Sequence, residues 1–256
     1  MINIEKAESE FNNYVKNYDM DNVNINGKFF HSHRVKQIAE EIAKSLNLSE
    51  EEIKLAKLIG LLHDIARFEQ YTKYQTFSDL KSIDHGDFGV EILKQNNFIR
   101  KFIETNEYDN IIFNAIKNHN KFKIEDGLTE KELLYSKIVR DADKLDIYFE
   151  ILTMFYQTPE DLEAVENGII TDEHMKQILK NEDIERKINQ NKMDSFLLLL
   201  CFVFNYNFKY SFEIMYKEDY INRLLDRFDF KNQDTKEKIK IIKEELNNYI
   251  KLHLKS

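Results

Sequence analysis

The chain has 256 residues, enough for one large domain or two modest ones, and its 37 basic and 46 acidic residues give a formal net charge of −9. That charge argues against a partner held through the backbone of an extended nucleic acid, but it is compatible with a small phosphorylated substrate. One cysteine excludes an internal disulfide, and a single proline with six glycines predicts long helices joined by short links.

Apolar residues at helical spacing predict an all-α fold, with a first helix over about 3–18. A second is expected over about 31–46, and a third from Ser49 into the pair His63-Asp64. The polar and aromatic segment 65–84 shows weak periodicity, so we expect a partly ordered loop over the site. Further helices are predicted at about 87–104, 108–119, 130–156, 159–167, 172–181, 183–209, 211–229 and 234–254.

Helix-start signatures support this assignment. Ser49 with Glu52 and Thr129 with Glu132 have the spacing of capping boxes, and Thr158-Pro159 places a proline at a first helical position. We expect residues 1–157 to form a helical metal-binding domain, with its core at about 28–150. Residues 158–256 should form a helical extension packed on the same core, because no flexible linker composition separates the two parts.

The start of the chain has neither the basic nor the apolar segment of a secretion signal. The longest apolar stretch, Phe196 to Phe204, is less than half of the roughly 20 residues that a membrane-spanning helix needs. These features lead us to expect a cytoplasmic protein without a membrane partner.

The adjacent residues His63 and Asp64 end a nearly continuous apolar helix. Burying a carboxylate there is costly without a cation, although an ion pair between Asp64 and Arg67 would also meet that need. His119 lies on the apolar face of its own helix, where a histidine is often simply a core residue.

Three further residues complete a candidate ligand set: His33, His85 and Asp143. Each has an ordinary alternative, a surface position for the two histidines and a solvated acidic helix face for Asp143. The six residues together provide four imidazoles and two carboxylates, which suit one or two divalent metal ions.

The order His33, His63-Asp64, Asp143-Lys144-Leu145 resembles the HD superfamily of metal-dependent phosphohydrolases, over about residues 28–150. The resemblance implies a helical bundle in which His33, His63, Asp64 and Asp143 hold one divalent ion. His85 and His119 fall where binuclear members carry two additional histidines, and would join Asp64 at a second ion. His63 and Asp64 would then be the catalytic pair. His31 and His253 match no position of the pattern, and we expect them at the surface.

This resemblance predicts hydrolysis of a phosphate ester, in a nucleotide or another phosphomonoester or phosphodiester, by metal-activated water. The ion could be Mn, Fe, Ni, Co or Mg. Arg67 and Lys144 are candidates for holding the substrate phosphate, with ion pairs to nearby carboxylates as the alternative. The protein could also form oligomers.

Two other functions fit the same residues. Some proteins of this fold hold two irons with four His and two Asp ligands and act as oxygenases, and others serve as non-catalytic nucleotide-binding regulatory modules. The sequence Ile65-Ala66-Arg67 lacks the Glu-Asp pair of guanosine tetraphosphate hydrolases, and no Gly-Tyr-Pro signature of cyclic dinucleotide phosphodiesterases is present.

Overall fold

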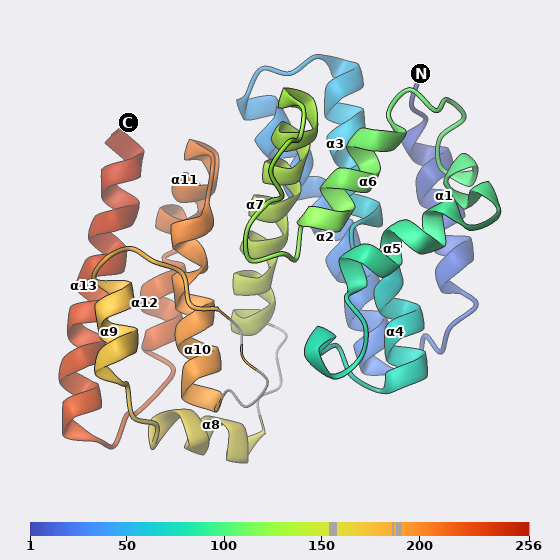
Figure 1. Ribbon diagram of the computed structural model, residues 1–256. Helices are drawn as coiled ribbons and strands as arrows, with labels where there is room; N and C mark the ends of the chain where they lie inside the picture. Colours follow the sequence, from blue (N-terminus) through green and yellow to red (C-terminus); the bar gives the residue numbers. More distant parts are fainter. Residues whose placement is uncertain (154–157, 186, 188–190, 256) are drawn as a thin grey trace. The chain divides into compact units, whose positions relative to one another are not determined.

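The computed structural model describes residues 1–153, 158–185, 187 and 191–255, and it is all-α, with no strand among these residues. The chain divides into two compact units, Met1–Asp146 and Ile147–Ser256 (Figure 1). The division falls inside a long helix, before the boundary expected at 157. The expected packing of 158–256 on the core of the first unit stays a prediction.

The first unit is built from seven α-helices and two short 3-10 helices within its described residues. These are α1 (Ile4–Val15), α2 (Val23–Ser45), α3 (Glu50–Leu62), α4 (Ala66–Tyr74), the 3-10 helix Asp79–Lys81, α5 (His85–Lys94), the 3-10 helix Gln95–Lys101, α6 (Asp109–Asn118) and α7 (Glu130–Thr153), of which the residues up to Asp146 belong to this unit.

The capping residues form the contacts expected of them. Glu52 accepts hydrogen bonds from the backbone N–H of Ser49 at 3.1 Å and from its hydroxyl at 2.7 Å. Thr129 donates its N–H to Glu132 at 2.7 Å and accepts from the N–H of Glu132 at 3.3 Å. Because these contacts satisfy groups that a helix start leaves free, they fix where α3 and α7 begin.

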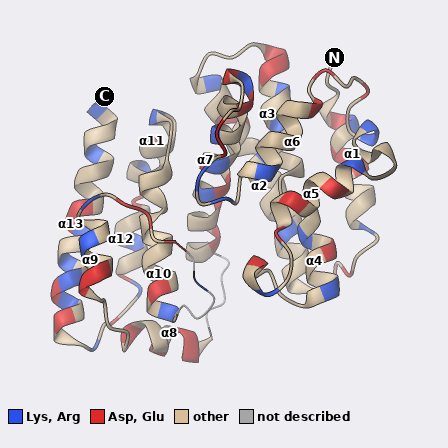
Figure 2. Ribbon diagram, in the orientation of Figure 1, with Lys and Arg blue, Asp and Glu red and all other residues tan. Residues whose placement is uncertain are grey.

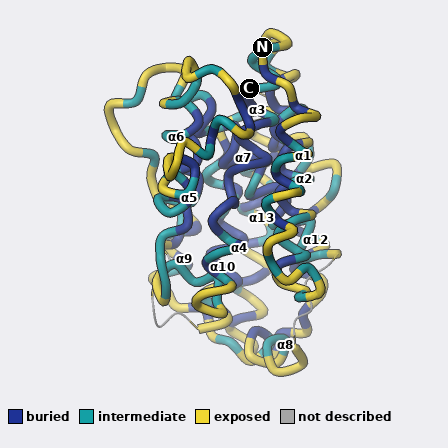
Figure 3. Tube along the Cα trace, turned by 90° about the vertical axis from the view of Figure 1, so that its right-hand side faces the viewer, coloured by how far each residue is buried: buried dark blue, intermediate teal, exposed yellow. Residues whose placement is uncertain are grey.

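The core of this unit centres on α2, α3 and α7. A glycine allows α2 and α3 to approach closely: a Cβ at Gly60 would lie 3.0 Å from both Lys36 Cα and Val35 O. Nearly every position of α7 from Tyr135 to Asp146 is buried, and Figure 3 shows this run in dark blue. A helix buried on most sides is a central element, and its polar residues are therefore enclosed by other helices.

Three expected boundaries in the first unit are wrong. The helix expected at 31–46 begins at Val23, where Asn22 caps it. Residues 66–74 of the expected loop form α4, which was missed because it is short and its buried side includes the polar Gln70. The helix expected at 87–104 ends at Lys94, and left-handed residues Asn96 and Asn97 follow.

The second unit contains α8 (Pro159–Glu166), α9 (Asp172–Ile178), α10 (Lys192–Cys201), the 3-10 helix Phe202–Asn205, α11 (Lys209–Lys217), α12 (Tyr220–Leu225) and α13 (Gln233–Lys255). Its own core includes Leu197, Leu200 and Leu246. Lys and Glu residues are spaced along α13 (Figure 2), as on a helix with one solvated face.

The expected helices of this unit are partly broken. The segment 211–229 divides into α11 and α12, because Asp219 takes a left-handed conformation (φ 52°). Helix α10 begins only at Lys192, although 183–209 was expected to be one helix, and residues 186 and 188–190 of that span lie outside the described residues, as do 154–157 of the helix expected at 130–156. Among the described residues, no helix is long and apolar enough to cross a membrane.

Candidate metal centre

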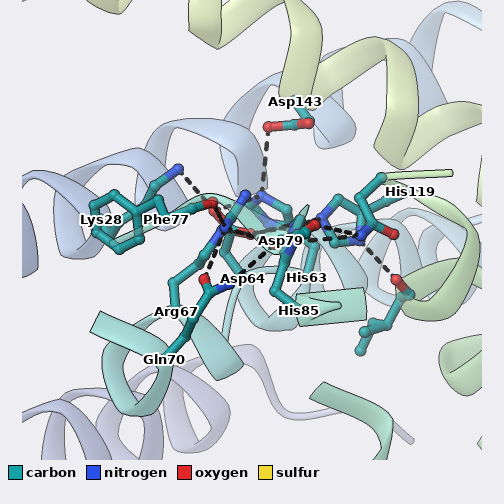
Figure 4. A network of polar contacts seen from close by, with 12 residues as sticks. Lys28, His63, Asp64, Arg67, Gln70, Phe77, Asp79, His85, His119 and Asp143 are labelled. Carbon is teal, nitrogen blue, oxygen red and sulfur yellow. Dashed lines mark hydrogen bonds and ion pairs between the residues drawn. The ribbon is translucent and has the colours of Figure 1, made fainter. Parts of the chain in front are cut away.

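Six side chains from five parts of the first unit converge on one buried point. Figure 4 labels five of them, His63, Asp64, His85, His119 and Asp143. His31 comes from α2, His63 and Asp64 directly follow α3, His85 begins α5, His119 directly follows α6, and Asp143 lies on α7. The four histidines and Asp64 are each at most 3% exposed. The termini of α3, α5 and α6 therefore meet the middle of α2 and α7 at a single polar cluster inside an apolar bundle.

Asp64 is the centre of this cluster, because its two oxygens face different histidines. Oδ2 lies 3.5 Å from His31 Nε2 and 3.6 Å from His63 Nε2. Oδ1 lies 3.3 Å from His85 Nε2 and 3.5 Å from His119 Nε2. The geometry thus forms two groups of potential ligands that share one carboxylate.

Asp143 belongs to the first of these groups. Its Oδ1 lies 3.1 Å from His31 Nε2 and 3.6 Å from His63 Nε2. Its side chain is 15% exposed, compared with 3% for that of Asp64. Asp143 is therefore the most exposed of the six side chains.

The outer ring nitrogen of every one of these histidines faces an acceptor. His63 Nδ1 donates to Gly60 O at 2.8 Å, and His119 Nδ1 donates to Ile116 O at 2.6 Å. His31 Nδ1 and His85 Nδ1 each lie 2.6 Å from a carboxylate, of Asp146 and of Asp79 respectively. A proton held on Nδ1 leaves the Nε2 lone pair directed inward, which is how proteins usually orient metal-binding histidines.

The distances between the inward-facing Nε2 atoms suit ligands of a shared divalent ion. His31 Nε2 and His63 Nε2 are 3.3 Å apart, and His85 Nε2 and His119 Nε2 are 2.9 Å apart. Two lone pairs at such distances repel unless a cation or a proton lies between them. Ligands that sit about 2.1 Å from one shared ion are about 3 Å from each other when they occupy adjacent positions, so this spacing matches the donor set of a metal site.

The structure corrects the first histidine of the set, because His31 lies in the cluster and His33 does not. His33 Nε2 lies 3.2 Å from Asn12 Oδ1, and its ring packs 4.7 Å from that of Phe29. Residues two apart on a helix point in nearly opposite directions, so only one of the two can face the cluster. The surface position expected for His31 is also wrong, since it is fully buried.

A signal for His31 was present in the sequence. The apolar face of this helix includes Val35, Ile38, Ala39 and Ile42, and one turn before Val35 is position 31. The spacing therefore placed His31 on the buried face. It was overlooked because the helix was expected to begin at 31 rather than at Val23.

A scan against family models matched residues 29–148 to the HD domain. These residues form an HD domain. No curated protein and no solved structure matched the chain. The HD domain is the domain of a superfamily of metal-dependent phosphohydrolases, and the buried His and Asp groups of this one could hold a metal.

Charge compensation within the HD domain keeps its central carboxylates ionised. Burial alone would raise the pKa of Asp64, but the charges of Lys28, His63 and Arg67 hold that pKa well below its usual range. Burial likewise opposes ionisation of Asp143, while hydrogen bonds with His31 and His63 hold its pKa well below the usual range. Both carboxylates are thus available as anionic ligands.

Three histidines of the cluster have shifted pKa values, and these shifts go in two directions. Burial lowers the pKa of His63, and burial with the nearby charge of Arg67 lowers that of His85 to about 3, so both rings are neutral at pH 7. For His31, burial and the charge of Lys28 also act to lower the pKa. Hydrogen bonds with Asp143 and Asp146 outweigh them and raise the pKa to about 9. In the metal-free protein the His31 ring is therefore charged at pH 7.

A polar network in the HD domain holds His85 in place, and sequence reasoning missed its members Gln70 and Asp79. Asp79 Oδ1 accepts from Gln70 Nε2 at 2.9 Å and from Arg67 at 3.2 Å. Asp79 Oδ2 faces His85 Nδ1 at 2.6 Å and accepts from Asn120 Nδ2 at 3.0 Å. The network ties α4 and the segment after it to the second group of ligands (Figure 4).

Arg67 was expected to contact phosphate or to pair with a carboxylate, and the structure shows the second arrangement. Its Nε lies 3.4 Å from Asp64 Oδ1, and its NH1 group donates to Phe77 O at 2.7 Å and to Gln70 at 2.8 Å as well as to Asp79. With these partners, Arg67 orients the cluster from one side. Lys144 is 8% exposed, and its contact with phosphate stays a prediction.

Arg140, on α7, also positions the cluster, and the sequence analysis did not identify it. Its side chain is buried, with 4% exposure. It donates to the carbonyl oxygens of Asn118 at 2.8 Å and of Lys121 at 2.5 Å. These carbonyls belong to the last residue of α6 and to the turn that follows it, and they lie on either side of His119. Because a buried guanidinium needs several acceptors, this contact fixes the turn against α7.

Proposed function

We propose that this HD domain hydrolyses a phosphate ester with water activated by one or two bound divalent ions. The observation that carries the proposal is Asp64, whose two oxygens each face a separate pair of inward-directed imidazoles. A carboxylate in this position can bridge two ions. The superfamily to which HD domains belong supports the same reaction class.

In this proposal the first ion is held by His31, His63, Asp64 and Asp143, and the second by Asp64, His85 and His119. The mixed imidazole and carboxylate donors suit Mn, Fe, Ni, Co or Mg. Bound ions would supply a water whose pKa is lowered from about 16 toward about 7, together with positive charge for the phosphoryl oxygens.

The residues around the ligands have complementary roles. Asp79 and Asp146 accept from the Nδ1 atoms of His85 and His31 and so hold these rings in one orientation. Arg34 fixes Asp146 in turn, through Nε at 2.7 Å and NH2 at 2.9 Å. Since such outer contacts keep the ligands from relaxing toward one another, the site would be formed before an ion arrives.

We propose a small phosphorylated substrate, such as a nucleotide, that approaches from the side of Asp143, the most exposed of the proposed carboxylate ligands. Lys144 follows it on α7 and is proposed as a phosphate contact. The net charge of −9 disfavours an extended nucleic acid but does not affect a single pocket that carries its own cations.

Oxygenase chemistry on two irons is the second candidate function, because four histidines and two aspartates in the cluster also suit two irons. The two reactions differ in what they consume. Metal analysis followed by assays for phosphate release and oxygen uptake separates them.

The first experiment is elemental analysis of protein purified without added metal or chelator, followed by a screen of phosphomonoesters, phosphodiesters and nucleotides with each candidate ion. The decisive pair of variants is His31→Gln and His33→Gln. They change the same residue type, two positions apart on α2, and only the first removes a proposed ligand. Asp64→Asn removes the shared carboxylate.

We expect His31→Gln to lose the first ion and Asp64→Asn to lose both ions, and both variants to lose phosphohydrolase activity while keeping their helical circular dichroism. His33→Gln should retain both. Full activity in Asp64→Asn, or loss of metal in His33→Gln but not in His31→Gln, would show that the site is assigned incorrectly. Two irons with oxygen uptake and no phosphate release would establish the alternative, and absence of metal after reconstitution would leave a regulatory module.

A further inference from the structure

Lys28 is a charged neighbour of the metal centre that the proposed reaction does not use. It lies on α2 one turn before His31, and its Nζ is 2.9 Å from Asp64 Oδ2. This oxygen is the one that faces His31 and His63. The ammonium group of Lys28 therefore lies against the carboxylate oxygen that the first ion would bind.

The two cations beside Asp64 lie at different oxygens of its carboxylate. Arg67 faces Oδ1 and is fastened by hydrogen bonds to Phe77 O, Gln70 and Asp79. Lys28 is a flexible side chain that is 17% exposed, and its Nζ lies 5.7 Å from the centre of the Phe77 ring, at the edge of the cluster (Figure 4). Lys28 therefore approaches Asp64 at the oxygen that Arg67 does not face, and its side chain is more exposed than that of Arg67.

Charge balance gives Lys28 a reason to be there. Asp64 is 2% exposed, and a carboxylate buried to that extent is costly unless a cation compensates it. Once a divalent ion supplies that compensation, an ammonium group at the same oxygen is repelled by the ion. Compensation by Lys28 and compensation by metal at Oδ2 therefore oppose each other.

We propose that Lys28 is the counter-ion of Asp64 in the metal-free protein and an internal competitor of the first ion. This inference rests on the metal centre proposed above. Lys28 is a positioning residue that keeps Asp64 oriented while the site is empty. When the ion binds, the ammonium group moves off Oδ2 toward the exposed edge of the cluster, where it can meet an anionic group of the substrate.

The test is the affinity of the first group of ligands for Mn²⁺ in full-length Lys28→Met, measured by calorimetry after chelation and dialysis. The His119→Gln background keeps the His31, His63, Asp64 and Asp143 set, and the His31→Gln background keeps the second set. A matched control is Lys36→Met, because Lys36 is a buried lysine on the same helix that pairs with Glu8 at 2.6 Å, away from the cluster.

We expect Lys28→Met to tighten Mn²⁺ binding about tenfold in the His119→Gln background, the size of a typical coupling between two binding events. It should leave binding in the His31→Gln background unchanged, and Lys36→Met should change neither. Lys28→Arg should restore the weaker binding.

Thermal unfolding supplies a second readout that does not depend on activity. Lys28→Met should lower the melting temperature of the metal-free protein more than that of the Mn²⁺-loaded protein, because only the former needs the ammonium group. If the variant does not fold without metal, Lys28→Gln gives the same comparison with a smaller change in polarity.

Several outcomes would overturn the inference. Equal tightening in both backgrounds would show only a long-range effect of one charge, and unchanged affinity would show that Lys28 and the ion share Oδ2. Equal loss of stability with and without metal would show an ordinary structural role. If the wild-type chain binds neither Mn²⁺ nor the other candidate ions, the metal centre itself is absent, a result that is distinct from the failure of Lys28 alone.

Discussion

Replacing Asp79 by asparagine should lower the affinity for the second ion, although Asp79 is not itself a proposed ligand. Asp79 Oδ2 faces His85 Nδ1 at 2.6 Å and Asn120 Nδ2 at 3.0 Å, while Oδ1 accepts from Gln70 Nε2 and Arg67. All four neighbouring groups donate. An asparagine amide has one acceptor oxygen and one NH₂ donor group. In either orientation of the amide, the NH₂ group would therefore face two of the four neighbouring donors without an acceptor.

The magnitude follows from the contact to His85. A hydrogen bond to a charged group contributes about 1.5–3 kcal/mol. Loss of such an outer partner typically lowers metal affinity by about 10–100-fold, and at about 1.4 kcal/mol for each factor of ten these two estimates agree. We therefore expect Asp79→Asn to lower the affinity for the second ion by about 10–100-fold and the affinity for the first ion by less than about threefold.

The assay is stepwise calorimetric titration of the metal-free protein with Mn²⁺, accompanied by elemental analysis after dialysis. Asp87→Asn is the matched control. Asp87 lies on α5 near His85 and pairs with Lys121 at 2.6 Å, outside the cluster. Unchanged binding of the second ion in Asp79→Asn, or an equal loss in Asp87→Asn, would refute the argument that Asp79 acts by holding His85.

Two further predictions concern pH and the contact between helices. The pKa of His31, raised from 6.5 to about 9, means that this ring is charged at pH 7 and must lose a proton before Nε2 can bind an ion. Binding of the first ion should therefore release about one proton between pH 6.5 and 9 and strengthen as pH rises, which calorimetry in buffers of different ionisation enthalpy measures; no proton release at pH 7 would contradict the expected charge. Gly60→Ala should lower the free energy of unfolding by about 1–3 kcal/mol through overpacking, partly offset by about 1 kcal/mol from the higher helix propensity of alanine. It should also weaken metal binding, because the added Cβ separates α2 from α3. Gly27→Ala, on the same α2 with no atom within 4 Å of the new Cβ, should keep or raise the melting temperature; equal effects of the two variants would count against this explanation.

Much of the local structure could be predicted from the sequence because it depends on near neighbours. The low content of proline and glycine and the apolar spacing predicted an all-α fold, and the capping residues Ser49 and Thr129 marked two helix starts. The breaks at Asn96 and Asp219 were not predicted. The first depends on two left-handed residues, Asn96 and Asn97, and the second on one, Asp219.

Part of the site could also be predicted. The residues His63, Asp64, His85, His119 and Asp143 were selected by their order, and the structure brings all five together. His63, Asp64 and His119 follow apolar helix faces, where a polar residue needs a partner. His85 and Asp143 joined them only through the resemblance to the HD superfamily.

The sequence alone indicated that this chain is helical, that residues 28–150 resemble an HD domain, and that His63, Asp64 and His119 lie on apolar helix faces. Only the tertiary structure decided that His31 rather than His33 completes the cluster, that Arg67 is held by α4 and the following segment, and that Lys28 lies against Asp64. The reason is physical: helical spacing says which residues share a face of one helix. Which face meets which neighbour depends on where α2 begins and on contacts between helices far apart in the chain.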